Sequence, residues 1–209
     1  MSDKKYIALT FDDGPSDHTS LKVLEKLKKY DVKASFFLIG NEITSEREEI
    51  IRAELEYGCD IENHSLTHSD MRTLDAETIK AEIEETTRRI VAITGKEPMF
   101  FRPPYINVND LMYEVIPYIF ICGIACDDWV PEVSAEERAR KAIEGARDGA
   151  LVLLHDMEGN DNTVDALDII IPELKKQGYE FVTLRQLFER AGITPENAKR
   201  DIYTYTLGD

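Results

Sequence analysis

Two adjacent carboxylates stand in the stretch "LTFDDGP", residues 9–15, directly after an apolar run typical of a strand. Asp12 and Asp13 would repel each other, and a turn needs only one aspartate, so the pair suggests two different roles. A carboxylate bound to a metal is neutralised, whereas an unbound neighbour can accept a proton from metal-bound water, whose pKa falls to roughly 7 on zinc. The alternative is an Asx turn shaped by Gly14 and Pro15.

The chain has four histidines, and two of them have metal-ligand spacing. In "HSLTH", His64 and His68 are four residues apart, which would bring both rings to one side of a helical turn and let their nitrogens converge on one ion. No "HExxH" glutamate accompanies them, so a metalloprotease is not favoured. A carboxylate is the common third ligand of catalytic zinc sites, and the aspartate pair could supply it. His18 has no such partner and is expected in a loop.

Further polar residues each follow an apolar run. His155 comes after "LVLL" and would suit a general acid, although a lone histidine is commonly structural. Arg102, in the rigid "FRPPY", could hold a neighbouring base ionised, and Asp128, in "DDW", could keep His155 protonated. Trp129 belongs either to the core or to the wall of a substrate pocket.

Short apolar runs alternate with longer amphipathic ones, and this pattern predicts the elements that carry these residues. The run "CDIEN" before His64 is a further candidate strand, and the predicted strands are Tyr6–Thr10, Ala34–Ile39, Met99–Phe101, Tyr118–Ile124, Ala150–Leu154 and Phe181–Thr183. Such alternation indicates one α/β domain with a mainly parallel sheet, either open and doubly wound or closed into a barrel. In both, catalytic residues gather at the carboxyl ends of the strands.

The clearest predicted helices cover residues 76–94, 135–147 and 163–178. Ser134 and Glu137 fit a capping box before the second helix, and Gly95 and Gly178 fit the C-terminal ends of the first and third. Pro172 lies inside the third and predicts a kink or break there.

Composition restricts the function classes. The chain has 209 residues and a net charge of −16, which argues against nucleic-acid and anionic-membrane partners. Its three cysteines, Cys59, Cys122 and Cys126, lack CxxC spacing, so neither a disulfide framework nor a cysteine zinc site is expected. The charged start passes straight into the first strand without a signal peptide, as in a cytoplasmic protein or a trimmed secreted one. We expect one catalytic domain over residues 1–209, with residues 193–209 as a C-terminal tail.

Taken together, the motifs resemble the polysaccharide deacetylases of carbohydrate esterase family 4, of the acetylxylan esterase and chitooligosaccharide deacetylase type. The resemblance runs from about Lys5 to Ala191 and rests on five motifs in order, which are "TFDDGP", "HSLTH", "RPPY", "DDW" and "LVLLHD". It implies a distorted (β/α) barrel with about seven parallel strands. It also implies hydrolysis of acetyl groups on an oligo- or polysaccharide by water activated on one divalent metal ion, with zinc as the default and cobalt or nickel as alternatives.

The resemblance assigns a role to each site residue. Its metal ligands are Asp13, His64 and His68, its base is Asp12, and its general acid is His155. The remaining residues position these groups or the substrate. Arg102 would orient Asp12, and Asp128 would tune His155. The Tyr105 backbone N–H would hold the oxyanion, and Trp129 and Leu153 would form the wall of the acetyl pocket.

Two departures from the family pattern affect substrate choice. Ile106 follows "RPPY" where the family often has glycine, and Ala125 stands where an aspartate is usual. The "DDWVP" stretch and the altered third motif resemble the xylan esterases, so an O-acetyl xylan substrate is favoured slightly. The alternatives are an N-deacetylase of N-acetylglucosamine polymers and a sugar-binding barrel without turnover. A phosphatase-like hydrolase would need a phosphate-binding glycine loop or a second metal cluster, and neither is evident.

Overall fold

The computed structural model describes residues 4–207, so the ends of the predicted 1–209 domain lie outside the described residues. The described strands are β1 (Lys5–Gly14), β2 (Ala34–Leu38), β3 (Asp60–Asn63), β4 (Phe100–Phe101), β5 (Ile119–Ile121), β6 (Ile124–Ala125), β7 (Ala150–His155), β8 (Tyr179–Phe181) and β9 (Ile202–Tyr203). The helices are α1 (Thr19–Lys29), α2 (Glu48–Tyr57), α3 (Ala76–Thr94), α4 (Asp110–Val115), α5 (Ala135–Gly145), α6 (Asp161–Lys176) and α7 (Leu184–Arg190), with short 3₁₀ turns at Gly40–Glu42, Met71–Thr73 and Pro104–Ile106.

The strands form one parallel sheet that curls into a distorted barrel. Their order is β6-β7-β1-β2-β3-β4-β5-β9, and β8 pairs with the start of β1. Residues 119–125 bring the ends of the curled sheet together, because β5 pairs with β4 and β6 pairs with β7. The predicted strand Tyr118–Ile124 is therefore two strands, separated at Gly123, whose φ of 146° is one that L side chains rarely adopt. The barrel prediction is confirmed.

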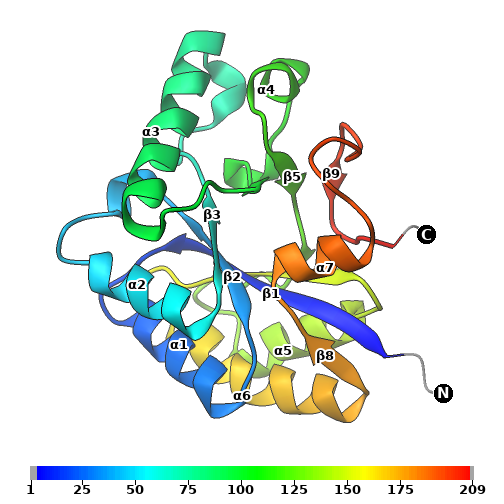
Figure 1. Ribbon diagram of the computed structural model, residues 1–209. Coiled ribbons are helices and arrows are strands. Elements are labelled where there is room, and N and C mark those ends of the chain that lie inside the picture. The colour runs from blue at the N-terminus through cyan, green and yellow to red at the C-terminus, as the bar shows by residue number, and fades with distance from the viewer. Residues whose placement is uncertain (1–3, 208–209) are drawn as a thin grey trace.

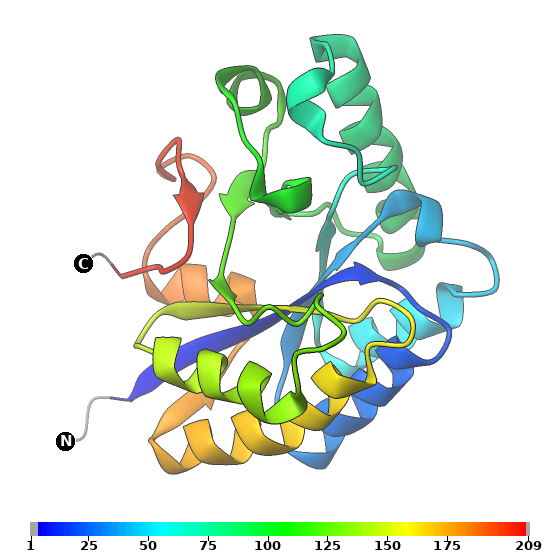
Figure 2. The ribbon, with the colours of Figure 1, turned by 180° about the vertical axis from the view of Figure 1, so that it is seen from behind.

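Residues 193–207 of the predicted tail take part in the fold. Strand β9 pairs with β5, and the Leu151 N–H donates to the Thr204 carbonyl at 3.1 Å. The segment from 202 to 206 thus runs from β5 to β7 beside the barrel, as its red ribbon shows in Figures 1 and 2. Main-chain hydrogen bonds, which side-chain patterns do not reveal, hold it there.

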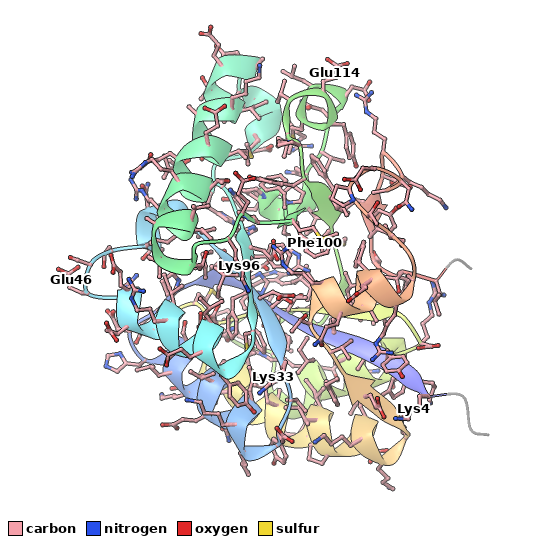
Figure 3. The ribbon with its side chains drawn as sticks, viewed as in Figure 1. Lys4, Lys33, Glu46, Lys96, Phe100 and Glu114 are labelled. Carbon is pink, nitrogen blue, oxygen red and sulfur yellow. The ribbon has the colours of Figure 1, made fainter. Side chains whose placement is uncertain are left out.

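The two faces of the sheet have different neighbours. Its outer face packs on α1, α2, α5 and α6, which lie together along one side of the barrel in Figure 1, and Ile7, Leu9 and Phe11 of β1 contribute to that core. The inner face packs on α7 at the amino ends of the strands. There Phe100, labelled in the middle of the molecule in Figure 3, meets Phe188 with ring centroids 4.7 Å apart. Burial on both faces explains the continuous apolar runs in the strands.

The predicted helices are largely confirmed. Helix α3 has the expected bounds and ends at Gly95 with a φ of 68°. At α5 the Ser134 hydroxyl accepts from the Glu137 N–H at 3.3 Å, which is the N-terminal half of the predicted capping box. Of the kink or break predicted at Pro172, the break is wrong, because α6 continues to Lys176. The buried residues Ile170, Ile171 and Leu174 hold the helix against the core on both sides of the proline. Within residues 4–207, no helix is long and apolar enough to cross a membrane.

Candidate metal centre and active site

The polar residues singled out from the sequence lie together at the carboxyl ends of the strands. Asp12 and Asp13 are near the end of β1, and His155 is the last residue of β7, paired in register with Asp12. His64 directly follows β3 and Arg102 directly follows β4. Parallel strands present these ends on one side of the barrel, so residues as far apart in sequence as Asp12 and His155 meet there.

Asp13, His64 and His68 form a group with the chemistry of a metal site. One potential ligand atom from each residue lies within 4.8 Å of the others. Asp13 Oδ1 is buried and makes no hydrogen bond, although His64 Nε2 is 3.3 Å away and His68 Nε2 is 3.5 Å away. A buried carboxylate oxygen without a partner is costly, and a cation between it and two imidazoles would satisfy it. The donor set therefore fits a divalent metal ion, with two nitrogens and one oxygen.

The histidines reach this point from a loop and not from a helix. The prediction of a helical turn at "HSLTH" is wrong, because residues 64–70 are irregular, and Ser65 and His68 have positive φ values of 66° and 57°. His64 Nδ1 lies 2.7 Å from the Arg102 carbonyl oxygen, to which it donates, and this leaves Nε2 facing Asp13. The buried side chain of Asn63 accepts from the Ser65 N–H at 2.8 Å and fixes the turn.

Glu82, which the sequence analysis did not single out, supports the same loop from α3. Its carboxylate accepts hydrogen bonds from the Leu66 N–H at 2.9 Å and the Thr67 N–H at 2.8 Å. The Thr67 hydroxyl donates to the other oxygen at 2.8 Å. Three bonds to one side chain hold the loop between the two histidines, so a helical glutamate without a motif takes part in positioning the site.

Electrostatics distinguish the members of the trio. Burial raises the pKa of Asp13, but the close approach and charge of the His64 imidazole outweigh it and bring that pKa to about 2. Burial and the neighbouring His64 lower the pKa of His68 below its ordinary value. Asp13 is thereby kept ionised and His68 is shifted toward its neutral form, which are the forms that bind a metal. Burial lowers the pKa of His64, but the charges of Asp12 and Asp13 outweigh it and raise that pKa, so metal binding would displace a proton from His64.

Asp12 faces a different partner. Its Oδ1 accepts from Arg102 Nη1 at 2.5 Å, and both side chains are buried. Arg102 Nη2 donates to the Thr10 hydroxyl at 2.8 Å and also to the Cys122 carbonyl, so the guanidinium is fixed from several sides. Its charge lies over the ring of Phe37, 4.3 Å from the centroid. The buried guanidinium thus holds the Asp12 carboxylate in one orientation.

His155 is held by Asp128. Asp128 Oδ1 lies 2.7 Å from His155 Nδ1, and Asp128 Oδ2 accepts from the His155 backbone N–H at 2.7 Å. Asp128 is fully buried. Burial lowers the pKa of His155, but the hydrogen bond and charge of Asp128 outweigh it and raise that pKa to about 9. The imidazole is therefore a proton donor at neutral pH, with Nε2 free to act.

A cleft opens beside two members of the trio, Asp13 and His68. It has a volume of about 460 Å³ and is lined by residues that include Asp13, His68, Asn41, Thr67 and Met157. A second hollow of about 250 Å³ shares Met157 and contains Trp129. The two hollows share Met157 and Glu158 of the loop after β7, so they adjoin each other along that loop.

Aromatic side chains stand at the edges of the site. Trp129 is 45% exposed, and its ring meets that of His155 edge-on with centroids 5.7 Å apart. Tyr105 is 64% exposed and meets His68 at 4.7 Å. Leu153 is buried two residues before His155 on β7, on the same face of the strand. The structure thus brings all three predicted wall and oxyanion residues to this end of the barrel.

The two departures from the family pattern have different local settings. Ile106 has a φ of 56° and follows Tyr105 at 58°, so two consecutive residues adopt the left-handed conformation beside His68. Glycine would adopt it without strain, whereas a β-branched residue does so only at a cost. Ala125 is exposed on β6, where it pairs with Leu153. Neither residue contacts the trio or Asp12 in the described hydrogen bonds.

Known proteins resemble the chain along most of its length. A family model described as polysaccharide deacetylase matches residues 1–117. A bifunctional xylanase/deacetylase of Pseudobutyrivibrio xylanivorans is 47% identical over 92% of this chain, which spans 32% of that protein. This chain therefore covers about a third of the length of that relative.

Two solved structures have the same fold. The Xyl-CE4 domain of a multidomain xylanase from the hindgut metagenome of Trinervitermes trinervoides has a TM-score of 0.95 and 44% identity, covering 99% of this chain and 100% of the other. A family 4 acetyl xylan esterase from Clostridium thermocellum, solved with a cobalt ion, has a TM-score of 0.92 and 40% identity, covering 96% of this chain and 98% of the other.

Proposed function

Because the chain belongs to the polysaccharide deacetylase family, we propose that it is a metal-dependent hydrolase that removes acetyl groups from a carbohydrate. One observation carries this proposal. A buried carboxylate oxygen of Asp13 without a hydrogen bond lies between two imidazoles, directly beside a second aspartate that is paired with a buried arginine. Such an arrangement provides one carboxylate for a metal and another for a proton.

The residues divide the chemistry among themselves. Asp13, His64 and His68 would hold the ion, which when bound supplies a Lewis acid for the acetyl carbonyl and lowers the pKa of water. Asp12 accepts the proton of the attacking water, and Arg102 orients its carboxylate. The backbone N–H of Tyr105 donates to the acetyl oxygen as negative charge develops there.

His155 completes the reaction as the general acid. Its protonated imidazole donates a proton to the departing sugar oxygen or nitrogen, and Asp128 keeps it charged until then. Trp129 and Leu153 enclose the methyl group and help to exclude water. Because the base and the acid are both held in place, the site can take one proton from water and give another to the leaving group without rearranging.

We favour acetylated xylan as the substrate. Three similarities support this choice, because the xylanase/deacetylase, the Xyl-CE4 domain and the acetyl xylan esterase are between 40% and 47% identical to this chain. The acidic character of the protein also suits an uncharged polymer, since a net charge of −16 repels anionic substrates. The identity of the metal is proposed as zinc, with cobalt and nickel as alternatives.

The test is acetate release from acetylated xylan and from chitooligosaccharides, measured in parallel after chelation and again after adding zinc or cobalt. We expect metal-restored release from the xylan. Metal-restored release from the chitooligosaccharide alone would show that the bond hydrolysed is an amide and not an ester. No release from either, with metal bound to the protein, would favour a sugar-binding barrel.

A further inference from the structure

A buried arginine lies behind the predicted general acid and has no carboxylate partner at ion-pair distance. Arg138, on α5, is 1% exposed, and none of its contacts within residues 4–207 is a salt bridge. Placing a guanidinium out of water is unfavourable unless its donors are satisfied and a counter-charge is near. Burial lowers the pKa of Arg138, and the charge of Asp128 opposes that effect. Asp128 therefore acts as the counter-charge, although the two side chains do not touch.

The donors of Arg138 fix two loops at the mouth of the barrel. Nε donates to the Val133 carbonyl and Nη2 to the Val130 carbonyl, both at 2.9 Å. These carbonyls belong to the loop between β6 and α5, which also carries Trp129. Nη1 donates to Asn160 Oδ1 at 2.5 Å and to the Thr163 hydroxyl at 2.8 Å.

Two short chains of hydrogen bonds lead from Arg138 to His155. In the first, the Thr163 hydroxyl donates to Asp128 Oδ2 at 2.8 Å, and Asp128 Oδ1 faces His155 Nδ1 at 2.7 Å. In the second, the Asn160 amide donates to the His155 carbonyl at 3.0 Å. The arginine can only donate, and the carboxylate can only accept, so the single proton of the Thr163 hydroxyl must point to Asp128.

We propose that Arg138 and Thr163 are positioning residues that hold Asp128, and through it His155, in the orientation needed to protonate the leaving group. A hydroxyl between a cation and an anion is polarised by both, which strengthens each bond of the chain. His155 engages both oxygens of Asp128, and the bond from Thr163 ties that carboxylate to α6 and to Arg138. The proposal rests on the general-acid role of His155 in the proposed function.

Thr163 is the best position for the test, because replacing Arg138 removes four hydrogen bonds and can disrupt the loop as a whole. Thr163→Val keeps the shape and removes the hydroxyl, whereas Thr163→Ser keeps the hydroxyl. Thr86→Val is a matched control, since the buried Thr86 hydroxyl donates only to the Glu82 carbonyl within its own helix, at 2.9 Å.

The first measurement compares two leaving groups in the metal-loaded protein. A sugar oxygen leaves poorly without a proton, whereas 4-nitrophenyl acetate releases a stable phenolate and needs little general-acid help. For Thr163→Val we expect kcat on an acetylated xylooligosaccharide to fall roughly 10-fold or more, a fraction of the total contribution of general-acid catalysis, which is about 10²–10⁴. The loss on the aryl ester should be several-fold smaller, and Thr163→Ser should restore most of the sugar-ester activity.

The second measurement is independent of turnover. In ¹⁵N-histidine-labelled protein without added metal, the Nδ1 proton of His155 should give a protected, downfield NMR signal in the wild type, Thr163→Ser and Thr86→Val. In Thr163→Val the signal should shift, and the proton should exchange faster with water. Equal losses on both esters together with an unchanged signal would overturn the proposal. If the wild type releases no acetate from either ester, the proposed function fails, and the NMR signal still decides whether Thr163 positions His155.

Discussion

The carboxylates of Asp12 and Asp13 face different partners although the residues are adjacent in the chain. Asp12 Oδ1 is 2.5 Å from Arg102 Nη1, whereas Asp13 Oδ1 lies among the two imidazoles of His64 and His68. The backbone explains the divergence, because Asp13 has a φ of 72°, in the left-handed region that aspartate tolerates better than most residues. Both carboxylates approach the His64 imidazole, since Asp12 Oδ2 lies 3.8 Å and Asp13 Oδ1 3.3 Å from its Nε2, but only Asp12 is paired with Arg102.

Metal binding should stabilise the folded protein as well as activate it. The three proposed ligands come from two separate segments and are arranged only in the folded state, so binding favours that state. At a free metal concentration 100 times the dissociation constant, the free energy of unfolding should rise by about 2.7 kcal/mol. Thermal denaturation with chelator and with added zinc measures this effect.

A pair of histidine variants provides the control for that experiment. His68→Ala should lose the metal-dependent rise in melting temperature, whereas His18→Ala should keep it, because His18 is exposed and pairs with Glu158 at 2.7 Å. An equal metal response in both variants would exclude His68 as a ligand.

The activity should depend on the protonation of His155. A general acid works only while protonated, so activity on sugar esters should fall as the pH rises through the pKa of this group, which Asp128 raises to about 9. Asp128→Asn removes the carboxylate that favours the imidazolium, so the pKa should fall and the alkaline limb of the kcat profile should move to lower pH by at least about one unit. Asp127→Asn, which loses only a surface pair with Lys141 at 2.5 Å, should leave the limb in place. If the alkaline limb of the kcat profile does not move in Asp128→Asn, a group other than His155 produces that limb.

Ile106 should store strain beside the metal centre. Its φ of 56° is unfavourable for a β-branched residue, with a cost of roughly 1–2 kcal/mol. Ile106→Gly should therefore be more stable than Ile106→Ala by about 1 kcal/mol in urea denaturation, since both lose the side chain and only glycine relieves the backbone. If the alanine variant were as stable as the glycine variant, the left-handed conformation would not be a source of strain.

Sequence motifs and hydrophobic patterns predict part of this structure, because each reflects the chemistry of residues that are close in sequence. The apolar runs predict most strands, since a strand buried on both faces needs continuous hydrophobic side chains. The apolar pattern gives inexact bounds for the short strands β4 and β6, and it does not predict strand β9. They are held mainly by main-chain bonds to neighbours that are distant in sequence.

The residues that support the site were the hardest to predict. Arg138 stands in "EERARK", which has the composition of an exposed helix face, and Glu82 stands in a similar stretch of α3. Their burial arises only when loops fold over them, and a single sequence carries no signal of that. Thr10, by contrast, lies within "TFDDGP", and its bond to Arg102 could have been suspected from the alternation along β1.

The most direct test of the account is a side-by-side comparison of Asp12→Asn and Asp13→Asn, with bound metal and acetate release measured on the same samples. Asp12→Asn should retain about one metal ion per chain and lose on the order of 10²–10⁴ in kcat, because it removes only the base. Asp13→Asn should bind metal more weakly and regain part of its activity at high metal concentration. Equal metal affinity in the two variants, or full activity in Asp12→Asn, would contradict the division of roles between the adjacent aspartates.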